Sequence, residues 1–274
     1  KIYLILPTYL RGIIKKKFLK KKKILPKMVV SGYHMFLYKN KIVITGGSGR
    51  FGSVLKNTKS RYKIYFPKKN EFNILNFKKI KSYLVKKKPK YLIHMAGLSR
   101  PMRIHNKKID KSIDLNIIGT ANITKACFLY GIKLIYFSTS AVYPGTKGNY
   151  NEKDSLLPKN NYAWSKLGGE SCVQMYKNSL ILRVCMTEKP FVHIRAFSDY
   201  TTNFVFHEEV AKILFKIINK KGIINLGGKP QTVYNFVKTF NSKIKKNYAK
   251  KLPDYKNSLN PSMNIKKLKK ILND

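Results

Sequence analysis

Tyr162 and Lys166 lie four residues apart in the segment NNYAWSKLGGE, a spacing that places two side chains on one face of a helix. A phenol with an ordinary pKa near 10 exchanges protons poorly at neutral pH, and lowering that pKa by about 3 units requires roughly 4 kcal/mol. An ammonium about 4 Å away supplies this much at an effective dielectric near 20. We therefore predict that Lys166 acidifies Tyr162, which then exchanges a proton with a carbonyl or hydroxyl oxygen.

Two further polar residues are predicted to join this pair. Thr139 ends the apolar segment KLIYFST, 23 residues before Tyr162, so its hydroxyl is expected at the carboxyl end of a strand, where ligands of open α/β sheets bind. Asn116, in DLNIIGTANITKA, is predicted to lie on the helix that leads into that strand and to anchor a water near Lys166. A Tyr-x-x-x-Lys pair alone is also compatible with an exposed helix face. Thr139 and Asn116 favour a catalytic role for the pair instead.

A glycine-rich turn follows the first apolar segment, where KIVIT runs into TGGSGRFG. The first of its spaced glycines, Gly46, permits a tight turn, Gly49 lets backbone N–H groups approach a pyrophosphate, and Gly52 lets the next helix pack on a sheet. The pattern indicates dinucleotide binding rather than an incidental glycine turn. Further cofactor contacts are expected from the other residues of the loop, Ser48, Arg50 and Phe51.

The residues after the segment KIYF bear on which dinucleotide binds. A site for NAD usually offers an acid there to the ribose 2′-OH. Here the chain continues with Pro67, Lys68 and Lys69, and Arg50 lies in the glycine loop. Because cations fit a 2′-phosphate, the sequence slightly favours NADP over NAD, with chance placement among so many lysines as the alternative.

Alternating strands and helices are needed to position these residues. Such alternation, with nearly continuous apolar strands, predicts a doubly wound parallel sheet covered by helices on both faces, an α/β fold of the Rossmann type. We expect an NAD(P)-binding Rossmann domain at 35–184 and a small substrate-binding lobe at 185–274, interleaved with the last strands and helices. The predicted strands are 41–45, 63–66, 91–95, 133–139, 179–184 and 223–227, and the predicted helices include 76–86, 109–129, 162–177 and 207–219.

The first 34 residues differ from the rest of the chain in charge. Residues 1–34 hold ten basic residues and no acid, and the sequence begins with Lys1 rather than Met. Met35 then opens FLYKNKIVITGG, which resembles a natural start. We therefore expect residues 1–34 to be a basic extension that is disordered or not native to the protein, with a basic targeting arm as the alternative.

The overall composition is that of a folded protein. The 274 residues are 43% apolar and 12% aromatic, which excludes wholesale disorder. No run approaches the roughly 18 uncharged apolar residues that cross a bilayer. The three cysteines, Cys127, Cys172 and Cys185, lack CxxC spacing, so neither a disulfide framework nor a metal site is indicated and we expect a cytoplasmic protein.

The formal net charge of +45 would ordinarily suggest a nucleic-acid-binding surface. Only seven of the 57 basic residues are Arg, however, and Arg reads bases and phosphates better than Lys does. The lysines are spread along the chain beside abundant Ile and Asn, which share A/T-rich codons with Lys. We therefore predict a surface of solvated lysines and no specific nucleic-acid partner, with polyanion binding as the alternative.

Together, these motifs resemble the extended short-chain dehydrogenase/reductase superfamily, and most closely its branch of nucleotide-sugar reductases and epimerases typified by dTDP-4-dehydrorhamnose reductase. The matching segments follow the family's order over about residues 41–272: TGGSGRFG, KPKYLIHMAG, DLNIIGTANITKA, FSTSAVYPG, EKDSLLPKNNYAWSKLGGE and LILRV. The resemblance implies a catalytic triad of Thr139, Tyr162 and Lys166, supported by Asn116. It also implies cofactor contacts by the glycine loop and by Asn73, Ile74, Ala96 and Gly97.

The resemblance implies an NAD(P)H-dependent reductase of a nucleotide-linked keto-sugar, with hydride from nicotinamide C4 and a proton from Tyr162. An NAD-dependent epimerase with the same triad is an alternative, because Ser140 and Ala141 replace the acids that rhamnose-type reductases and 4,6-dehydratases carry just after the threonine. A non-catalytic, cofactor-binding regulatory subunit is another. The superfamily also implies a homodimer, and we expect substrate contacts from residues 185–206 and from Ser99, Arg100 and Ser140.

Three other polar residues have structural explanations. His94 closes a predicted buried strand and is expected to be a satisfied core residue. His105 follows that strand near Arg100, where it could meet a sugar diphosphate or belong to an ordinary surface loop. Glu170, four residues after Lys166, is expected to form a structural pair rather than to catalyse.

Overall fold

The computed structural model describes residues 29–30, 33–34, 40–255 and 257–273. The chain divides between residues 35 and 36, and the two parts are described separately. In the first part, β1 (Val29–Val30) pairs antiparallel with β2 (Tyr33–His34). The predicted basic extension otherwise lies outside the described residues.

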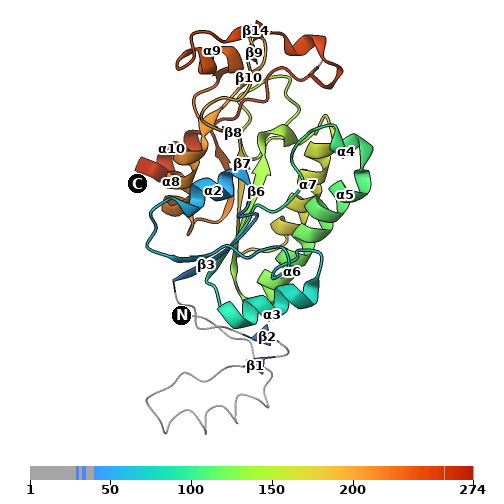
Figure 1. The fold of residues 1–274 in the computed structure, drawn as a ribbon, viewed down its shortest axis with the longest axis vertical. Coiled ribbons are helices and arrows are strands. Elements are labelled where there is room, and N and C mark those ends of the chain that lie inside the picture. The colour runs from blue at the N-terminus through green and yellow to red at the C-terminus, as the bar shows by residue number, and fades with distance from the viewer. Residues whose placement is uncertain (1–28, 31–32, 35–39, 256, 274) are drawn as a thin grey trace. The chain divides into compact units, whose positions relative to one another are not determined.

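Six parallel strands form the central sheet of the second part, in the order β12-β7-β6-β5-β3-β4 (Figure 1). Strand β4, which follows β3 in the chain, pairs with one side of β3, and β5 pairs with the other side. The strand order therefore reverses between β3 and β5. All six predicted strands are present, with bounds that differ by at most one residue. They are β3 (Lys41–Thr45), β4 (Lys63–Tyr65), β5 (Tyr91–His94), β6 (Lys133–Thr139), β7 (Ser179–Val184) and β12 (Gly222–Leu226).

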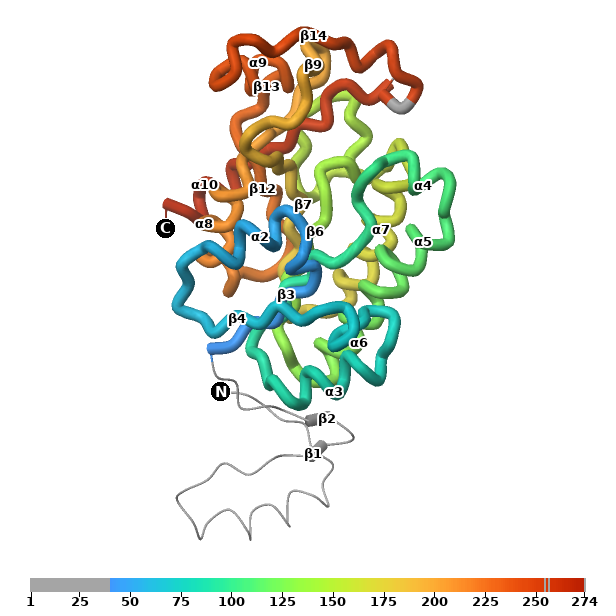
Figure 2. The backbone as a smooth tube through the Cα atoms, viewed as in Figure 1, coloured from blue at the N-terminus to red at the C-terminus, as the bar shows by residue number. Residues whose placement is uncertain are grey.

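Two layers of helices cover this sheet (Figures 1 and 2). On one face lie α2 (Arg50–Lys56), α8 (His207–Ile217) and α10 (Lys266–Asn273), and on the other lie α3 (Phe77–Lys87), α6 (Gly119–Tyr130) and α7 (Asn161–Gln174). No helix in the described part of the chain is long and apolar enough to cross a membrane. The doubly wound arrangement confirms the predicted fold class.

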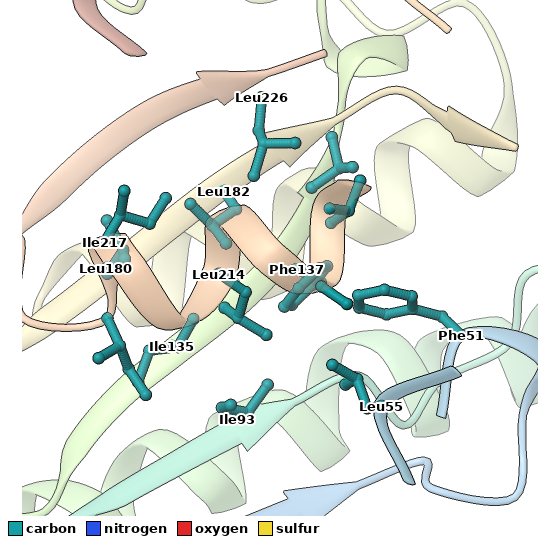
Figure 3. Close-up of a cluster of buried hydrophobic side chains, with 14 of the residues drawn as sticks. Phe51, Leu55, Ile93, Ile135, Phe137, Leu180, Leu182, Leu214, Ile217 and Leu226 are labelled. Carbon is teal, nitrogen blue, oxygen red and sulfur yellow. The ribbon is translucent and has the colours of Figure 1, made fainter. Parts of the chain in front are cut away.

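Side chains that alternate along the strands build a separate core on each face. In β3, Ile42 and Ile44 join the core under α2 and α8, whereas Val43 joins the core under α3 and α6. Figure 3 shows the first of these cores, in which Leu214 of α8 and Phe51 of α2 meet the apolar side chains of the sheet. Burial on both faces explains why the central strands are apolar at nearly every position.

The predicted helix at 109–129 is present, but it contains a π-helical turn that the sequence did not predict. The segment consists of α5 (Ile109–Ile113), the π-helical turn (Asp114–Ile118) and α6. The wide turn carries Asn116, which is 1% exposed and hydrogen-bonds to residues outside its own helix. Turns of this kind are frequent at functional sites.

A small lobe lies beyond the carboxyl ends of the strands, at the top of Figure 1. The residues of this lobe are not continuous in sequence. Helix α8 and strand β12 lie between its segments in the chain but belong to the main sheet and the helices that cover it. The lobe is held by short strand pairs: β9 (Arg195–Phe197) with β14 (Lys245–Asn247), and β10 (Thr201–Thr202) with β13 (Gln231–Thr232), which runs into α9 (Val233–Lys238). A further pair, β8 (Met186–Thr187) with β11 (Val205–Phe206), leads from β7 to α8.

Candidate active site

A cavity of about 960 Å³ opens at the carboxyl ends of the strands, where the strand order reverses between β3 and β5. Its volume is in the range of small-molecule sites, and its position is the one at which open α/β sheets bind ligands. Every residue that the sequence predicted for the site lines this cavity: Gly46, Ser48, Gly49, Arg50, Phe51, Gly52, Asn73, Ile74, Ala96, Gly97, Ser99, Arg100, Asn116, Thr139, Ser140, Tyr162 and Lys166.

The glycine loop packs closely against the end of β5. Gly46 has a φ of +77°, and a Cβ at this position would lie 2.7 Å from the backbone nitrogen of Ala96. A Cβ on Gly52 would lie 2.6 Å from the backbone of Gly47. The N–H of Gly49 donates to the carbonyl of Gly46 at 3.0 Å and closes the turn. Side chains are therefore excluded at these glycines, and the wall of the cavity here is backbone.

Tyr162 is positioned by the first turn of α7. The side chain of Asn160 accepts a hydrogen bond of 2.9 Å from the N–H of Ala163 and so fixes the start of this helix. The hydroxyl of Thr139, at the end of β6, interacts with the phenol and lowers its pKa. The ring of His105 packs edge-on against Tyr162, with centroids 5.1 Å apart. Helix α7 and strand β6 thus bring the two predicted hydroxyl groups together.

The pKa of Tyr162 is raised, which corrects the prediction that Lys166 acidifies this phenol. Burial disfavours the phenolate and outweighs two effects that lower the pKa, the interaction with Thr139 and the positive charge of Arg100. The cation that acts on the phenol is therefore Arg100. Tyr162 keeps its proton at neutral pH.

Lys166 lies over a neighbouring aromatic ring, with Nζ 4.2 Å from the ring centre of Tyr136. Burial lowers the pKa of Lys166 to about 7, although the negative charge of Glu170 one turn further along α7 opposes this shift. The charge of Lys166 in turn adds to burial in lowering the pKa of His94 to about 3. Lys166 can therefore gain or lose a proton near neutral pH, whereas His94 stays neutral.

Asn116 joins the loop after β5 to the helix that carries Tyr162. Its Oδ1 accepts a hydrogen bond of 2.7 Å from the N–H of Leu98, and its Nδ2 donates to the Leu98 carbonyl at 2.9 Å and to Ser165 Oγ at 2.8 Å. Ser165 Oγ donates to the carbonyl of Tyr162 at 2.8 Å. Both N–H donors of the Asn116 amide are used within the protein, and its side chain supports the turn around Tyr162.

An ion-pair cluster spans the cavity mouth. Glu188, just after β8, accepts hydrogen bonds from Arg50 Nη1 at 3.2 Å and from Arg100 Nη1 at 3.1 Å. The guanidinium of Arg50 therefore pairs with this carboxylate, which weakens the part of the NADP argument that placed Arg50 beside Lys68 and Lys69. Both lysines still line the cavity at the end of β4.

Sequence reasoning placed substrate contacts in 185–206 but singled out no residue there. The structure places Glu188 in this range, paired with an arginine from each of two loops. The chain has only 12 acidic residues, so an acidic residue in this range was a signal that could have identified Glu188.

The far wall of the cavity is aromatic. Tyr200 and Tyr255 contact each other edge-on, with centroids 5.2 Å apart, and Phe204 lies on the same wall. Cys185 and Thr202 also line the cavity, with Cys185 Sγ 2.9 Å from Thr202 Oγ1, and burial raises the pKa of the Cys185 thiol. Tyr200, Thr202 and Phe204 lie in the range 185–206 that the sequence predicted for substrate contacts, whereas Tyr255 was missed because it is distant in the chain and no periodic pattern connects it to Tyr200.

His94 and His105 are both packed inside the fold. His94 is a satisfied core residue as predicted, with Nδ1 2.8 Å from Thr45 Oγ1 and Nε2 3.1 Å from Thr120 Oγ1. His105, in α4 (Ile104–Lys107), is 1% exposed, and its Nδ1 lies 2.5 Å from Ser112 Oγ. Both alternatives for His105, a diphosphate contact and an exposed loop, are therefore wrong.

Glu170 forms the structural pair that the sequence predicted. Its Oε1 lies 2.6 Å from Arg183 Nη2, and its Oε2 accepts a hydrogen bond of 2.6 Å from Ser138 Oγ. Glu170 and Arg183 are 0% and 2% exposed, and Arg183 also donates to the hydroxyl of Tyr143 at 2.8 Å. The pair connects α7 to β7 directly behind the candidate site.

Comparisons with known proteins agree with this geometry. Residues 40–206 match the family model of the RmlD substrate binding domain. Methionine adenosyltransferase 2 subunit beta from Pongo abelii is 27% identical over 142 residues, which are 48% of this chain and 42% of that protein. The chain thus spans less than half the length of this curated relative.

Two solved structures share the fold. One is dTDP-4-dehydrorhamnose reductase from Bacillus anthracis in complex with NADP, with a TM-score of 0.73 at 21% identity over 82% of this chain and 89% of that chain. The other is UDP-glucose 4-epimerase from Thermus thermophilus in complex with NAD, with a TM-score of 0.60 at 17% identity over 72% of this chain and 81% of that chain. Because the family model covers more than half of the sequence, this chain belongs to the RmlD substrate binding domain family.

Proposed function

We propose that this protein is an NAD(P)H-dependent reductase of a nucleotide-linked keto-sugar. The observation that carries this proposal is the pair of neighbouring hydroxyl groups, Thr139 and Tyr162, on the wall of a cavity that also contains a glycine loop. Such a pair can bind one carbonyl oxygen and deliver a proton to it. We also propose that the protein forms a homodimer, as its resemblance to the superfamily implies.

NADP or NAD fits the long cavity. The close packing of Gly46 on Ala96 and of Gly52 on Gly47 fixes the turn, and the backbone of this loop lines the cavity where a pyrophosphate would bind. Asn73 and Ile74 would hold the adenine end, and Ala96 at the end of β5 would flank the nicotinamide. The two solved structures described above contain NADP and NAD. When bound, this cofactor supplies the hydride that reduces the sugar carbonyl.

The chain's own residues would handle the proton. Tyr162, whose pKa is raised by burial, is protonated at neutral pH and would donate its proton to the carbonyl oxygen as negative charge develops there. Thr139 would hydrogen-bond the same oxygen and keep it beside the phenol. The positive charge of Arg100 would favour the phenolate that remains, and Lys166 would hold the ribose hydroxyls of the cofactor.

The substrate side of the cavity suits a sugar nucleotide. Arg100 pairs with Glu188 through Nη1, and its remaining N–H donors could bind a diphosphate. Tyr200 and Tyr255 offer aromatic faces to a base, and Ser99 and Ser140 offer hydrogen bonds to a sugar. The chemistry of this wall supports a nucleotide-linked substrate over a free sugar.

Replacing Tyr162 with Phe tests the proposal. Loss of the proton donor should reduce kcat by roughly 10²- to 10⁴-fold while the Kd for NADPH stays unchanged. Turnover is measured as loss of NADPH absorbance with a panel of nucleotide-linked keto-sugars, and the exposed Tyr248→Phe is the matched control. Normal turnover in Tyr162→Phe would rule out this mechanism.

Two other functions have specific support. The relative named as a subunit of methionine adenosyltransferase favours a cofactor-binding subunit of another enzyme, for which no keto-sugar would be turned over. The Ser140-Ala141 sequence after Thr139 favours an epimerase. An epimerase would purify with tightly bound NAD and would consume no added NADPH.

A further inference from the structure

A second, smaller cavity lies at the opposite end of the sheet from the candidate active site. It has a volume of about 160 Å³ and shares no residue with the larger cavity. Its lining comes from the amino-terminal ends of β5 and β6, from the residues that precede β6 and β7, and from the end of α8: Lys90, Tyr91, Gly131, Lys133, Asn178 and Asn219.

Lys133 is the unusual residue of this cavity. It is 7% exposed, and among the described residues its Nζ is the only buried side-chain nitrogen or oxygen atom without a hydrogen-bond partner. An ammonium carries three donors, and burying one without an acceptor is costly. Burial, together with the positive charge of Lys221, lowers the pKa of Lys133 to about 8, so this ammonium still carries its charge at neutral pH.

The rest of the lining supplies donors and no carboxylate. Lys90 provides a second ammonium at the rim, and Asn178 provides an amide whose Nδ2 donates one hydrogen bond of 3.5 Å to the hydroxyl of Tyr176 and keeps a second N–H. The hydroxyl of Tyr91 donates to Asn219 Oδ1 at 2.5 Å, so the oxygen of this amide is already used and its NH₂ group is the part left for a ligand. A cavity with two cations and an excess of donors is complementary to an anion that offers several acceptor oxygens.

We propose that this cavity binds a tetrahedral oxyanion of the size of inorganic phosphate. Lys133 and Lys90 are its cationic contacts, and Asn178 and Asn219 are its neutral donors. The volume corresponds to about five waters at about 30 Å³ each, which suits such an ion but not a nucleotide. The bound anion gives Lys133 Nζ its missing partner and offsets its repulsion by Lys221. This inference does not depend on the proposed reductase activity.

Calorimetric titration of the full chain with inorganic phosphate, at constant ionic strength in chloride, tests the site. We expect saturable binding that becomes at least tenfold weaker in Lys133→Met and severalfold weaker in Lys90→Met. The matched control Lys81→Met removes an exposed lysine of α3 and should leave the affinity unchanged. Because Lys90 is exposed, its variant keeps the test valid even if Lys133→Met fails to fold.

The glycine loop is the other place where phosphate could bind, and Arg50→Met distinguishes the two. Affinity that survives Arg50→Met and is lost in Lys133→Met supports the proposed site, whereas the reverse pattern overturns it. Heats that never saturate also overturn it, because they indicate only screening of the net positive charge. Acetate should bind at least tenfold more weakly than phosphate, and equal binding would contradict a tetrahedral ligand.

Discussion

At the scale of single residues, Lys166 has the charge most sensitive to pH near neutrality. Burial lowers its pKa to about 7, whereas an unfolded lysine has a pKa of about 10.4. Between these two values the unfolded state binds more protons than the folded state does. The free energy of unfolding therefore rises with pH across this window, and below about pH 7 the buried ammonium destabilises the fold.

Lys166→Met should flatten this dependence on pH. We expect the wild-type protein to gain resistance to urea between pH 7 and 9, and the variant to gain less, because it has no ammonium to deprotonate. Urea unfolding at several pH values measures both, with Lys81→Met as a control that keeps the wild-type slope. Lys133, whose pKa is lowered to about 8, accounts for part of the rise that persists. Equal slopes in both proteins would contradict the lowered pKa of Lys166.

The sequence predicted which residues meet at the site, but it did not predict their protonation. Four-residue spacing on a helix and the end of an apolar strand were sufficient to bring Tyr162, Lys166 and Thr139 to one cavity. The pKa of Tyr162 depends instead on burial and on Arg100, which is distant in sequence. Spacing within one helix cannot report such tertiary effects, so the predicted acidification was wrong.

At the scale of elements, Glu188 ties the segment after β8 to the glycine loop and to the loop after β5. In Glu188→Gln both guanidinium groups become free to contact the phosphates of a dinucleotide. Because exposed ion pairs contribute at most about 1 kcal/mol each, we expect NADPH to bind about two- to fivefold more tightly. Fluorescence titration measures this affinity, with the exposed Glu209→Gln of α8 as control. Weaker binding in Glu188→Gln would show that the carboxylate supports the site instead of competing for it.

The buried pair of Glu170 and Arg183 holds α7 against β7. Glu170→Ala leaves the Arg183 guanidinium buried without its carboxylate, so we expect the free energy of unfolding to fall by about 3–5 kcal/mol. Urea unfolding is the measurement, and Glu209→Ala should change stability little. A loss below about 1 kcal/mol would mean that Tyr143 and water compensate the cation.

The regular elements were more predictable than their interruptions. The six strands follow from apolar runs, because helices bury both faces of the sheet. The π-helical turn around Asn116 was missed since its causes, the Leu98 backbone and Ser165, lie in other parts of the chain. The strand pairs of the small lobe, such as β10 with β13, have only two or three residues each, too few for any periodicity.

At the scale of the whole molecule, the net charge of +45 sets how anionic ligands arrive. An excess of one sign speeds the association of oppositely charged ligands, and added salt screens this effect. We expect the association rate of NADPH to fall by about tenfold as salt rises from about 0.02 to 0.5 M, with a much smaller change in the dissociation rate. Stopped-flow fluorescence measures both rates, and adenosine, which is uncharged, serves as the control. An association rate independent of salt would contradict steering by the lysines.

The residues that line the large cavity run from Thr45 to Tyr255. A ribosome must therefore release nearly all of this sequence before the cavity can be completed. A nascent chain halted after β7 would already contain the glycine loop and the Tyr162 helix, but not the aromatic wall. Full assembly of the pocket thus requires synthesis through Tyr255, and termination between Phe204 and Tyr255 would remove Tyr255 from this wall while leaving the earlier motifs intact.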